Sequence, residues 1–246
     1  MKAKMILMSI LLILTTMIIS CQKDTPRSID VFVDLSLSTN GERSFYKECI
    51  QSLTSLPFKS SDELSIFPIT SKTLSDSKPL LISKPFPKND ISKTPLMYRR
   101  EMNKFISDLK LQINSVCNKI DKLDPTPYTD IFSIFIVVSD RLSNEKKKHI
   151  IILSDMIEDS IIGGKRYNFS RDPINKEDYC ANLIKILKDE DMIPDLSGVV
   201  ISVCGAKSSS EKSDDQYRSI RKFWELYTKQ MGASIRFEST IQNILQ

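Results

Sequence analysis

Glycine and histidine are scarce in this sequence. Of its 246 residues, only six are glycine and one is histidine. No glycine-rich loop of the kind that cradles nucleotide phosphates is present, so the sequence does not indicate a nucleotide-binding enzyme. The single histidine, His149, precedes Asp155 by six residues in a segment with a strand pattern, which places the two side chains roughly 20 Å apart. A serine–histidine–aspartate triad is therefore not expected at the end of that strand.

A strong excess of one charge is also missing. Lys2 and Lys4 lie in an N-terminal segment that we expect to be cleaved, and without them 33 basic residues stand against 31 acidic ones. Proteins that bind nucleic acid need a basic surface to neutralise the phosphates. We therefore expect no nucleic-acid partner.

One long hydrophobic run stands at the start of the chain, from Met5 to Ile19. At about 15 residues it is shorter than the span of about 20 that crosses a bilayer, and it is typical of a secretory signal. The segment at its end, Ile-Ile-Ser-Cys over residues 18–21, resembles the lipobox of bacterial lipoproteins. The resemblance implies a signal peptide over residues 1–20, a lipid on Cys21 and a lipidated tether over residues 21–28. An ordinary signal peptide or a short membrane anchor is the alternative.

The residues after Cys21 bear on the destination of such a lipoprotein. Gln22, rather than aspartate, follows the cysteine. By resemblance to the sorting rules of bacterial lipoproteins, this disfavours retention at the inner membrane, and the segment 21–24 is similar to an export signal of surface lipoproteins. The resemblance implies a protein of the cell envelope, anchored by its N-terminal lipid to the outer membrane and exposed at the cell surface.

Four cysteines remain after the tether: Cys49, Cys117, Cys180 and Cys204. In the oxidising environment of an exported protein, four cysteines allow two disulfides. However, three lie on expected helix faces and one in an expected strand, mixed with apolar residues. This pattern favours buried free thiols, and the sequence leaves the disulfide state open.

Strand patterns and helix patterns alternate along the rest of the chain. Short apolar runs predict strands over 29–34, 63–70, 78–86, 149–155, 198–205 and 234–237, and helical spacing predicts helices over 42–55, 97–120, 129–142, 177–188 and 215–231. Pro79 and Pro85 place the third strand at a sheet edge, antiparallel to the second. The alternation predicts one α/β domain over residues 29–246, with a doubly wound, mostly parallel six-stranded sheet and helices on both faces.

Polar side chains gather where two of the expected strands end. Asp34 ends the first strand and Asp155 ends the fourth, and Ser36 and Ser38 follow Asp34 at alternate positions. In a sheet with the strand order 3-2-1-4-5-6 these two strands are neighbours, so both carboxylates face one crevice at the carboxyl edge. Thr129 precedes a helix on a loop expected at the same edge. Carboxylate and hydroxyl oxygens suit a small, hard cation, so the sequence predicts a cation site there.

This set resembles the metal-ion-dependent adhesion site of von Willebrand factor type A domains. The similarity lies in Asp-x-Ser-x-Ser after the first strand, a threonine before a later helix and Ser-Asp after the following strand; Leu37 and Tyr128 stand where the family usually has glycine. The resemblance implies the Rossmann-like fold of that family. It also implies a Mg²⁺, Mn²⁺ or Ca²⁺ ion bound directly by two serines and the threonine, with the aspartates acting largely through water. A protein partner would complete the ion's coordination with a carboxylate, in adhesion or in complex assembly.

The segment 157–173 is expected to be a loop beside this site. Its residues Lys165, Arg166 and Tyr167 are candidates for anchoring an acidic partner at the rim of the site. A simply solvated loop is the alternative.

Two other functions stay open. One is a structural envelope protein whose metal site is vestigial. The other is a metal-dependent hydrolase in which Glu158 or Asp159 acts beside Asp155. The favoured interpretation is a binding protein without enzymatic activity.

Overall fold

The computed structural model describes residues 25–59, 61–76, 78–88, 92–142, 147–205 and 213–241. The expected signal peptide (residues 1–20), Cys21 and residues 22–24 of the tether lie outside this part of the chain. Among the helices of the described residues, none combines the length and the apolar character that crossing a membrane requires.

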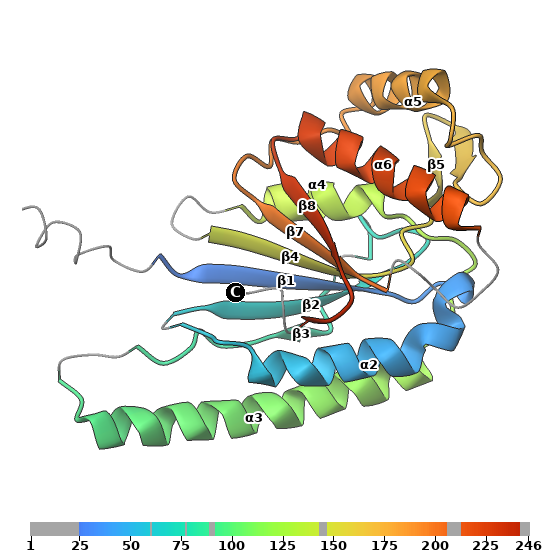
Figure 1. Cartoon of the computed structure of the whole chain (residues 1–246). Coiled ribbons are helices and arrows are strands. Elements are labelled where there is room, and N and C mark those ends of the chain that lie inside the picture. Colours follow the sequence, from blue (N-terminus) through green and yellow to red (C-terminus); the bar gives the residue numbers. More distant parts are fainter. Residues whose placement is uncertain are drawn as a thin grey trace, which may run out of the picture.

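Six strands form one mixed sheet in the order β3-β2-β1-β4-β7-β8 (Figure 1). Neighbouring strands are parallel, except that β3 runs antiparallel to β2. The strands are β1 (Arg27–Asp34), β2 (Glu63–Ile69), β3 (Leu81–Ile82), β4 (Lys147–Leu153), β7 (Val200–Cys204) and β8 (Ser234–Glu238). The α/β class predicted from the sequence is confirmed, and its sheet is mixed.

Helices cover both faces of the sheet (Figure 1). On one side lie α2 (Arg43–Ser52) and α3 (Pro95–Lys122); on the other lie α4 (Phe132–Asp140), α5 (Glu177–Asp189) and α6 (Asp214–Gln230). Strand β1 shows why two cores form. Ile29, Val31 and Val33 point into the core beside α2 and α3, whereas Phe32 points into the other, because side chains alternate between the faces of a strand.

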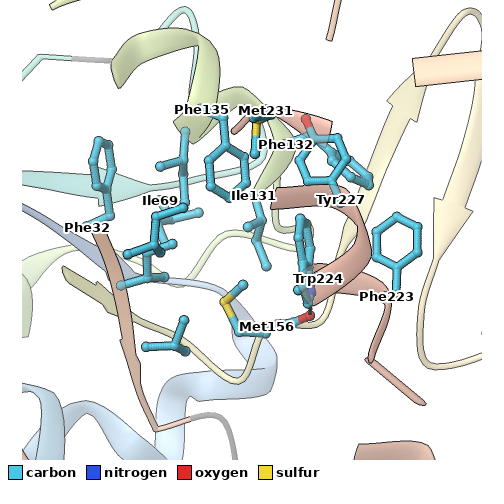
Figure 2. Packing of buried hydrophobic residues seen from close by; sticks show 14 of the residues in the cluster. Phe32, Ile69, Ile131, Phe132, Phe135, Met156, Phe223, Trp224, Tyr227 and Met231 are labelled. Atoms are coloured by element: carbon cyan, nitrogen blue, oxygen red, sulfur yellow. Dashed lines mark hydrogen bonds between the residues drawn. The ribbon is translucent and has the colours of Figure 1, made fainter. Parts of the chain in front are cut away.

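The second core is rich in aromatic residues. Phe132 and Phe135 of α4 pack against Trp224 and Tyr227 of α6 with ring centroids 5.0 to 5.9 Å apart (Figure 2). The indole N–H of Trp224 donates a hydrogen bond of 2.9 Å to the backbone oxygen of Met156, just beyond β4. Helix α6 is thereby fixed next to the carboxyl end of β4, where the candidate site lies.

The edge of the sheet beside β3 accommodates the prolines of the sequence. Strand β3 is only two residues long, in keeping with the expected edge strand between Pro79 and Pro85. Pro68 lies inside β2 without a backbone N–H. The backbone oxygens of Leu64 and Ile66 accept hydrogen bonds from the N–H groups of residues 83 and 80, so alternate residues of β2 direct their backbone groups toward β3. Pro68 is the next residue with this direction, and β3 does not pair with β2 beyond Ile66. The missing donor of Pro68 therefore costs no ladder hydrogen bond.

A β-hairpin stands where the sequence predicted a loop. Strands β5 (Asp159–Ile162) and β6 (Lys165–Asn168) pair antiparallel around Gly163 and Gly164, which have φ angles of 56° and 79°. Positive φ at both central positions is the requirement of a tight hairpin turn, and two glycines meet it without strain. The expectation of an irregular segment over residues 157–173 is therefore corrected for its central part.

The four cysteines Cys49, Cys117, Cys180 and Cys204 are buried free thiols. This agrees with the state that the sequence favoured.

Candidate metal site at the carboxyl edge of the sheet

The fold brings Asp34 and Asp155 to the same edge. Strands β1 and β4 are neighbours and pair up to Val33 and Leu153, so Asp34 and Asp155 follow the last paired residues. Both are buried, with exposed fractions of 0% and 2%. Ser154, which lies between Leu153 and Asp155, donates a hydrogen bond of 2.6 Å to Oδ2 of Asp34 and joins the two strand ends.

The loop after β1 folds its hydroxyls around Asp34. Oδ1 of Asp34 accepts a hydrogen bond of 2.9 Å from the backbone N–H of Ser36. The hydroxyl oxygens of Ser36 and Ser38 lie 3.0 Å apart, and Thr39 donates to the backbone oxygen of Asp34 at 3.2 Å. Ser36 is buried and Ser38 is exposed, so the pair leads from the interior to solvent. Asp155 is oriented in the same way, because its Oδ1 accepts a bond of 2.9 Å from the N–H of Ile157.

Thr129 reaches this edge through its loop. Thr126 exchanges backbone hydrogen bonds of 2.9 Å with Leu35 and Leu37. Thr129, 3% exposed, forms an antiparallel bridge to Asp159 at the start of the hairpin. The segment 126–129 is thus tied both to the loop after β1 and to the segment after β4. The hydrogen-bonded cluster itself contains Asp34, Ser36 and Ser38.

The electrostatics of the edge favour a positive charge. Burial and the neighbouring Asp155 carboxylate raise the pKa of Asp34 to about 6, against the lowering effect of the bonds from Ser154 and Ser36. Burial and the same two carboxylates also raise the pKa of Tyr46 on α2. Among the described residues, the fully buried Tyr46 hydroxyl has no hydrogen-bond partner. Two buried carboxylates and an unsatisfied hydroxyl therefore lie at one end of the sheet.

The expected rim residues fall in different environments. Arg166 makes two hydrogen bonds of 2.7 Å to the carboxylate of Asp159, and its guanidinium lies 4.5 Å from the ring centre of Tyr128. Lys165 is exposed, with its ammonium 5.2 Å from the ring centre of Tyr167. Tyr167 is only 2% exposed and belongs to the hydrophobic core. Its side chain therefore does not form part of the rim.

Glu158 has a structural environment that sequence patterns did not reveal. Its Oε2 accepts hydrogen bonds from the backbone N–H groups of Ile131 and Phe132, at 2.9 and 3.1 Å. Asp130 accepts a further bond of 3.2 Å from the N–H of Ser133. Burial and the charge of Asp130 raise the pKa of Glu158 well above its usual range. Glu158 thus caps α4 from a distant segment and is withdrawn from solvent.

A cavity of about 810 Å³ lies beside the candidate site, between the hairpin, the loop after β2 and the start of α4. Three of its lining residues are unusually exposed for apolar side chains: Leu74 at 48%, Tyr128 at 42% and Ile161 at 71%. Tyr128 adjoins Thr129, so the cavity and the hydroxyl cluster share the loop 126–129. No sequence pattern indicated this cavity, because its walls come from segments far apart in the chain.

Among the described residues, no three histidine, cysteine, aspartate or glutamate side chains converge on one point as a metal cluster. The candidate site contains only two such side chains, Asp34 and Asp155, and its other three donors are hydroxyls. Its donors are all oxygens, which are the ligands that Mg²⁺ and Ca²⁺ prefer.

Comparison with known proteins gives limited similarity. No family model and no curated protein matches the sequence. Among solved structures, the pilus adhesin SpaC of Lactobacillus rhamnosus GG is 14% identical with a TM-score of 0.45. The match covers 87% of this chain and 28% of the SpaC chain. The human COPII-coat protein Sec24c is 10% identical with a TM-score of 0.42. The match covers 90% of this chain and 31% of the Sec24c chain. This chain thus spans about a third or less of either protein, and similarities at this level carry no argument about function.

Proposed function

We propose that this protein is a von Willebrand factor type A-like domain that binds a divalent cation and, through it, a carboxylate of a protein partner. The observation that supports the proposal most directly is the hydrogen-bonded cluster of Asp34, Ser36 and Ser38 beside Asp155. Thr129 completes the proposed set of ligands. Mg²⁺ is the first choice of ion, with Mn²⁺ or Ca²⁺ as substitutes.

The residues present fit such an ion. The hydroxyls of Ser36, Ser38 and Thr129 are neutral donors, and the two carboxylates supply the charge that attracts a cation. The backbone N–H groups of Ser36 and Ile157 hold one oxygen of each carboxylate, which fixes the orientation of both groups. A bound cation would relieve the repulsion between them and supply a positive centre for an outside carboxylate.

The neighbouring cavity suits a second contact with the same partner. Its wall carries the apolar side chains of Leu74, Tyr128 and Ile161 next to the loop of Thr129. A partner with an apolar side chain close to its carboxylate would bury that side chain there, and apolar burial supplies affinity that the carboxylate alone lacks.

We also propose attachment to the cell envelope through a lipid on Cys21, at the outer membrane and facing the cell surface. The support is the Ile-Ile-Ser-Cys junction at residues 18–21 and the short distance from Cys21 to the start of β1 at Arg27. Metabolic labelling with palmitate should mark the wild type and not Cys21→Ser. Equal labelling of both would contradict the lipid.

Cation binding is tested by titrating Mg²⁺ and Mn²⁺ into protein freed of metal, followed by calorimetry and thermal melting. The wild type should bind and melt at a higher temperature with the ion, because a ligand that binds only the folded state stabilises it. Ser36→Ala should weaken binding at least tenfold. Ser115→Ala, which removes an exposed serine of α3, is the matched control and should bind as the wild type does. Melting that is insensitive to both ions would leave a vestigial site.

Partner binding is tested by capture of proteins from an envelope extract, with and without a chelator. Capture should be lost with the chelator and with Asp34→Asn, which keeps the size of the side chain and removes its charge. Partner binding that survives both changes would favour the structural alternative. Metal-dependent turnover of a generic ester or phosphate would favour the hydrolase instead.

A further inference from the structure

Helix α3 is much longer than the sheet that it covers. Its 28 residues extend about 42 Å, whereas the eight residues of β1 extend about 26 Å. The C-terminal end of α3 is fixed at the carboxyl edge, because Arg43 donates hydrogen bonds to the backbone oxygens of Ile120 and Leu123. The first turns of α3 therefore project beyond the opposite, amino edge of the sheet, as Figure 1 shows.

Aromatic contacts locate the point where this projection begins. The ring centres of Phe105 and Phe86 lie 4.3 Å apart, and the N–H of Phe86 donates to the backbone oxygen of Asp62. Asp62 in turn forms an ion pair of 2.6 Å with Arg27, the first residue of β1. Phe105 is therefore level with the start of β1. Residues 95–104, about 15 Å of helix, extend past it.

The projecting segment has an unusual surface for a solvated helix. Leu96 and Met97 are 57% and 52% exposed. Arg99, Arg100 and Lys104 are exposed beside them. The only acidic residue over 92–107 is Glu101, which is paired with Lys93 at 2.5 Å. Exposed apolar side chains next to exposed basic ones are typical of a surface that lies in the headgroup region of an anionic membrane.

The N-terminal tether brings the same end of the domain to a membrane. Cys21 precedes Arg27 by six residues, a segment that spans at most about 20 Å when extended. A lipid on Cys21 would therefore hold the amino edge of the sheet within that distance of the bilayer. The projection of about 15 Å then reaches the headgroups.

We infer that the first turns of α3 form a second membrane contact, in which Leu96 and Met97 enter the interface and Arg99, Arg100 and Lys104 meet anionic headgroups. The inference rests on the proposed attachment through Cys21. One lipid and one basic patch together hold a protein on a membrane more firmly than either does alone. This contact turns the candidate metal site, at the other edge of the sheet, away from the membrane and toward a partner.

The contact is tested on the full-length lipidated protein reconstituted into phosphatidylcholine vesicles that contain phosphatidylglycerol. A polarity-sensitive fluorophore is attached to Met97→Cys or, as the control, to Ile161→Cys, which lies in the hairpin beyond the carboxyl edge and is 71% exposed. The other cysteines of the described domain are buried. Brominated lipids should quench the fluorophore at position 97 at least twofold more than the one at position 161. Equal quenching at both positions would overturn the inference.

Charge reversal tests the basic part of the surface. Arg99→Glu with Arg100→Glu should abolish most of the extra quenching at position 97, as should vesicles without phosphatidylglycerol. Lys119→Glu with Lys122→Glu is the matched control, since it makes the same charge change at the far end of α3 and should leave the quenching intact. Vesicle flotation separates the two proposals: protein that floats without quenching at position 97 is attached but lacks the contact. Protein that does not float contradicts the lipid attachment and the contact with it.

Discussion

Strand β1 carries two fully buried aspartates, Asp30 and Asp34, in opposite electrostatic environments. Asp30 lies 2.7 Å from the ammonium of Lys148 and 3.4 Å from the guanidinium of Arg141. The carboxylate of Asp34 accepts hydrogen bonds from the hydroxyls of Ser154 and Thr39 and from the backbone N–H of Ser36. Burial and the neighbouring carboxylate of Asp155 raise its pKa. One end of the strand is thus neutralised by the protein, and the other carries negative charge.

This difference separates Asp30, which joins elements of the fold, from Asp34, which belongs to the proposed cation site. The cations around Asp30 come from β4 and from the end of α4, so that charge cluster joins three elements at the amino edge. Among the described residues, no ion pair of Asp34 matches those of Asp30, and Asp34 lies beside the carboxylate of Asp155 at the carboxyl edge. Uncompensated charge in a buried position is a feature of sites that bind or react, because stability alone would remove it.

The largest expected effect comes from breaking the cluster at Asp30. Asp30→Ala leaves the ammonium of Lys148, which is only 5% exposed, without its ion-pair partner. We expect the free energy of unfolding to fall by about 3–5 kcal/mol, measured by urea denaturation. The double variant Asp30→Leu with Lys148→Met should recover much of the loss, because it removes both charges. A loss below about 1 kcal/mol in Asp30→Ala would show that the pair is not needed.

A second effect appears in the pH dependence of stability without added cation. The pKa of Asp34 is raised to about 6, so the folded state binds an extra proton between about pH 4 and 6, and stability falls as the pH rises through this range. Burial lowers the pKa of His149 to about 4. The unfolded state then binds the extra proton between about pH 4 and 6.5, and stability rises with pH. Each contribution is about 3 kcal/mol at most, and the two oppose each other.

Substitution should reveal each contribution separately. In Asp34→Asn only the contribution of His149 remains. The free energy of unfolding of this variant should therefore increase, relative to that of the wild type, as the pH rises from 4 to 6. His149→Gln should lose stability over the same range. Thermal melting in the presence of a chelator measures both. Parallel pH curves for all three proteins would contradict the environments assigned to the two residues.

The smallest effect is expected at the ion pair of Arg166 and Asp159. The Arg166 side chain is 47% exposed, and exposed ion pairs stabilise proteins by about 1 kcal/mol or less. Arg166→Ala should therefore leave the urea midpoint almost unchanged. Arg166→Lys serves as its control, since it keeps the charge and loses the two-pronged geometry. A large loss of stability in Arg166→Ala would show that the hairpin depends on this contact.

The sequence was sufficient for the order of the strands in the six-stranded sheet and for the meeting of Asp34 with Asp155. Both depend on apolar runs that repeat locally and on the regular way in which parallel strands are connected. The third strand was predicted from the apolar run over 78–86, and Pro79 and Pro85 placed it at the sheet edge. These features follow from short stretches of chain, which is why a single sequence reveals them.

Features made by distant segments were not predictable in this way. Glu158 caps α4 across more than 20 residues, and no local pattern distinguishes that role from a solvated acid. Tyr167 is buried because the hairpin packs its face against the core. The hairpin around Gly163 and Gly164 was not predicted, because strands of four residues are too short for a periodic pattern to stand out.

The short edge strand β3 has a consequence for crowding. Proteins held on a membrane are concentrated in two dimensions, and an exposed sheet edge invites another copy to add a strand. Two paired residues followed by Pro85 offer little backbone for such an addition, and at the other edge β8 carries the exposed Arg236. Both edges therefore disfavour strand addition, so copies of this chain that are brought close together on the proposed membrane are not expected to join through their sheets.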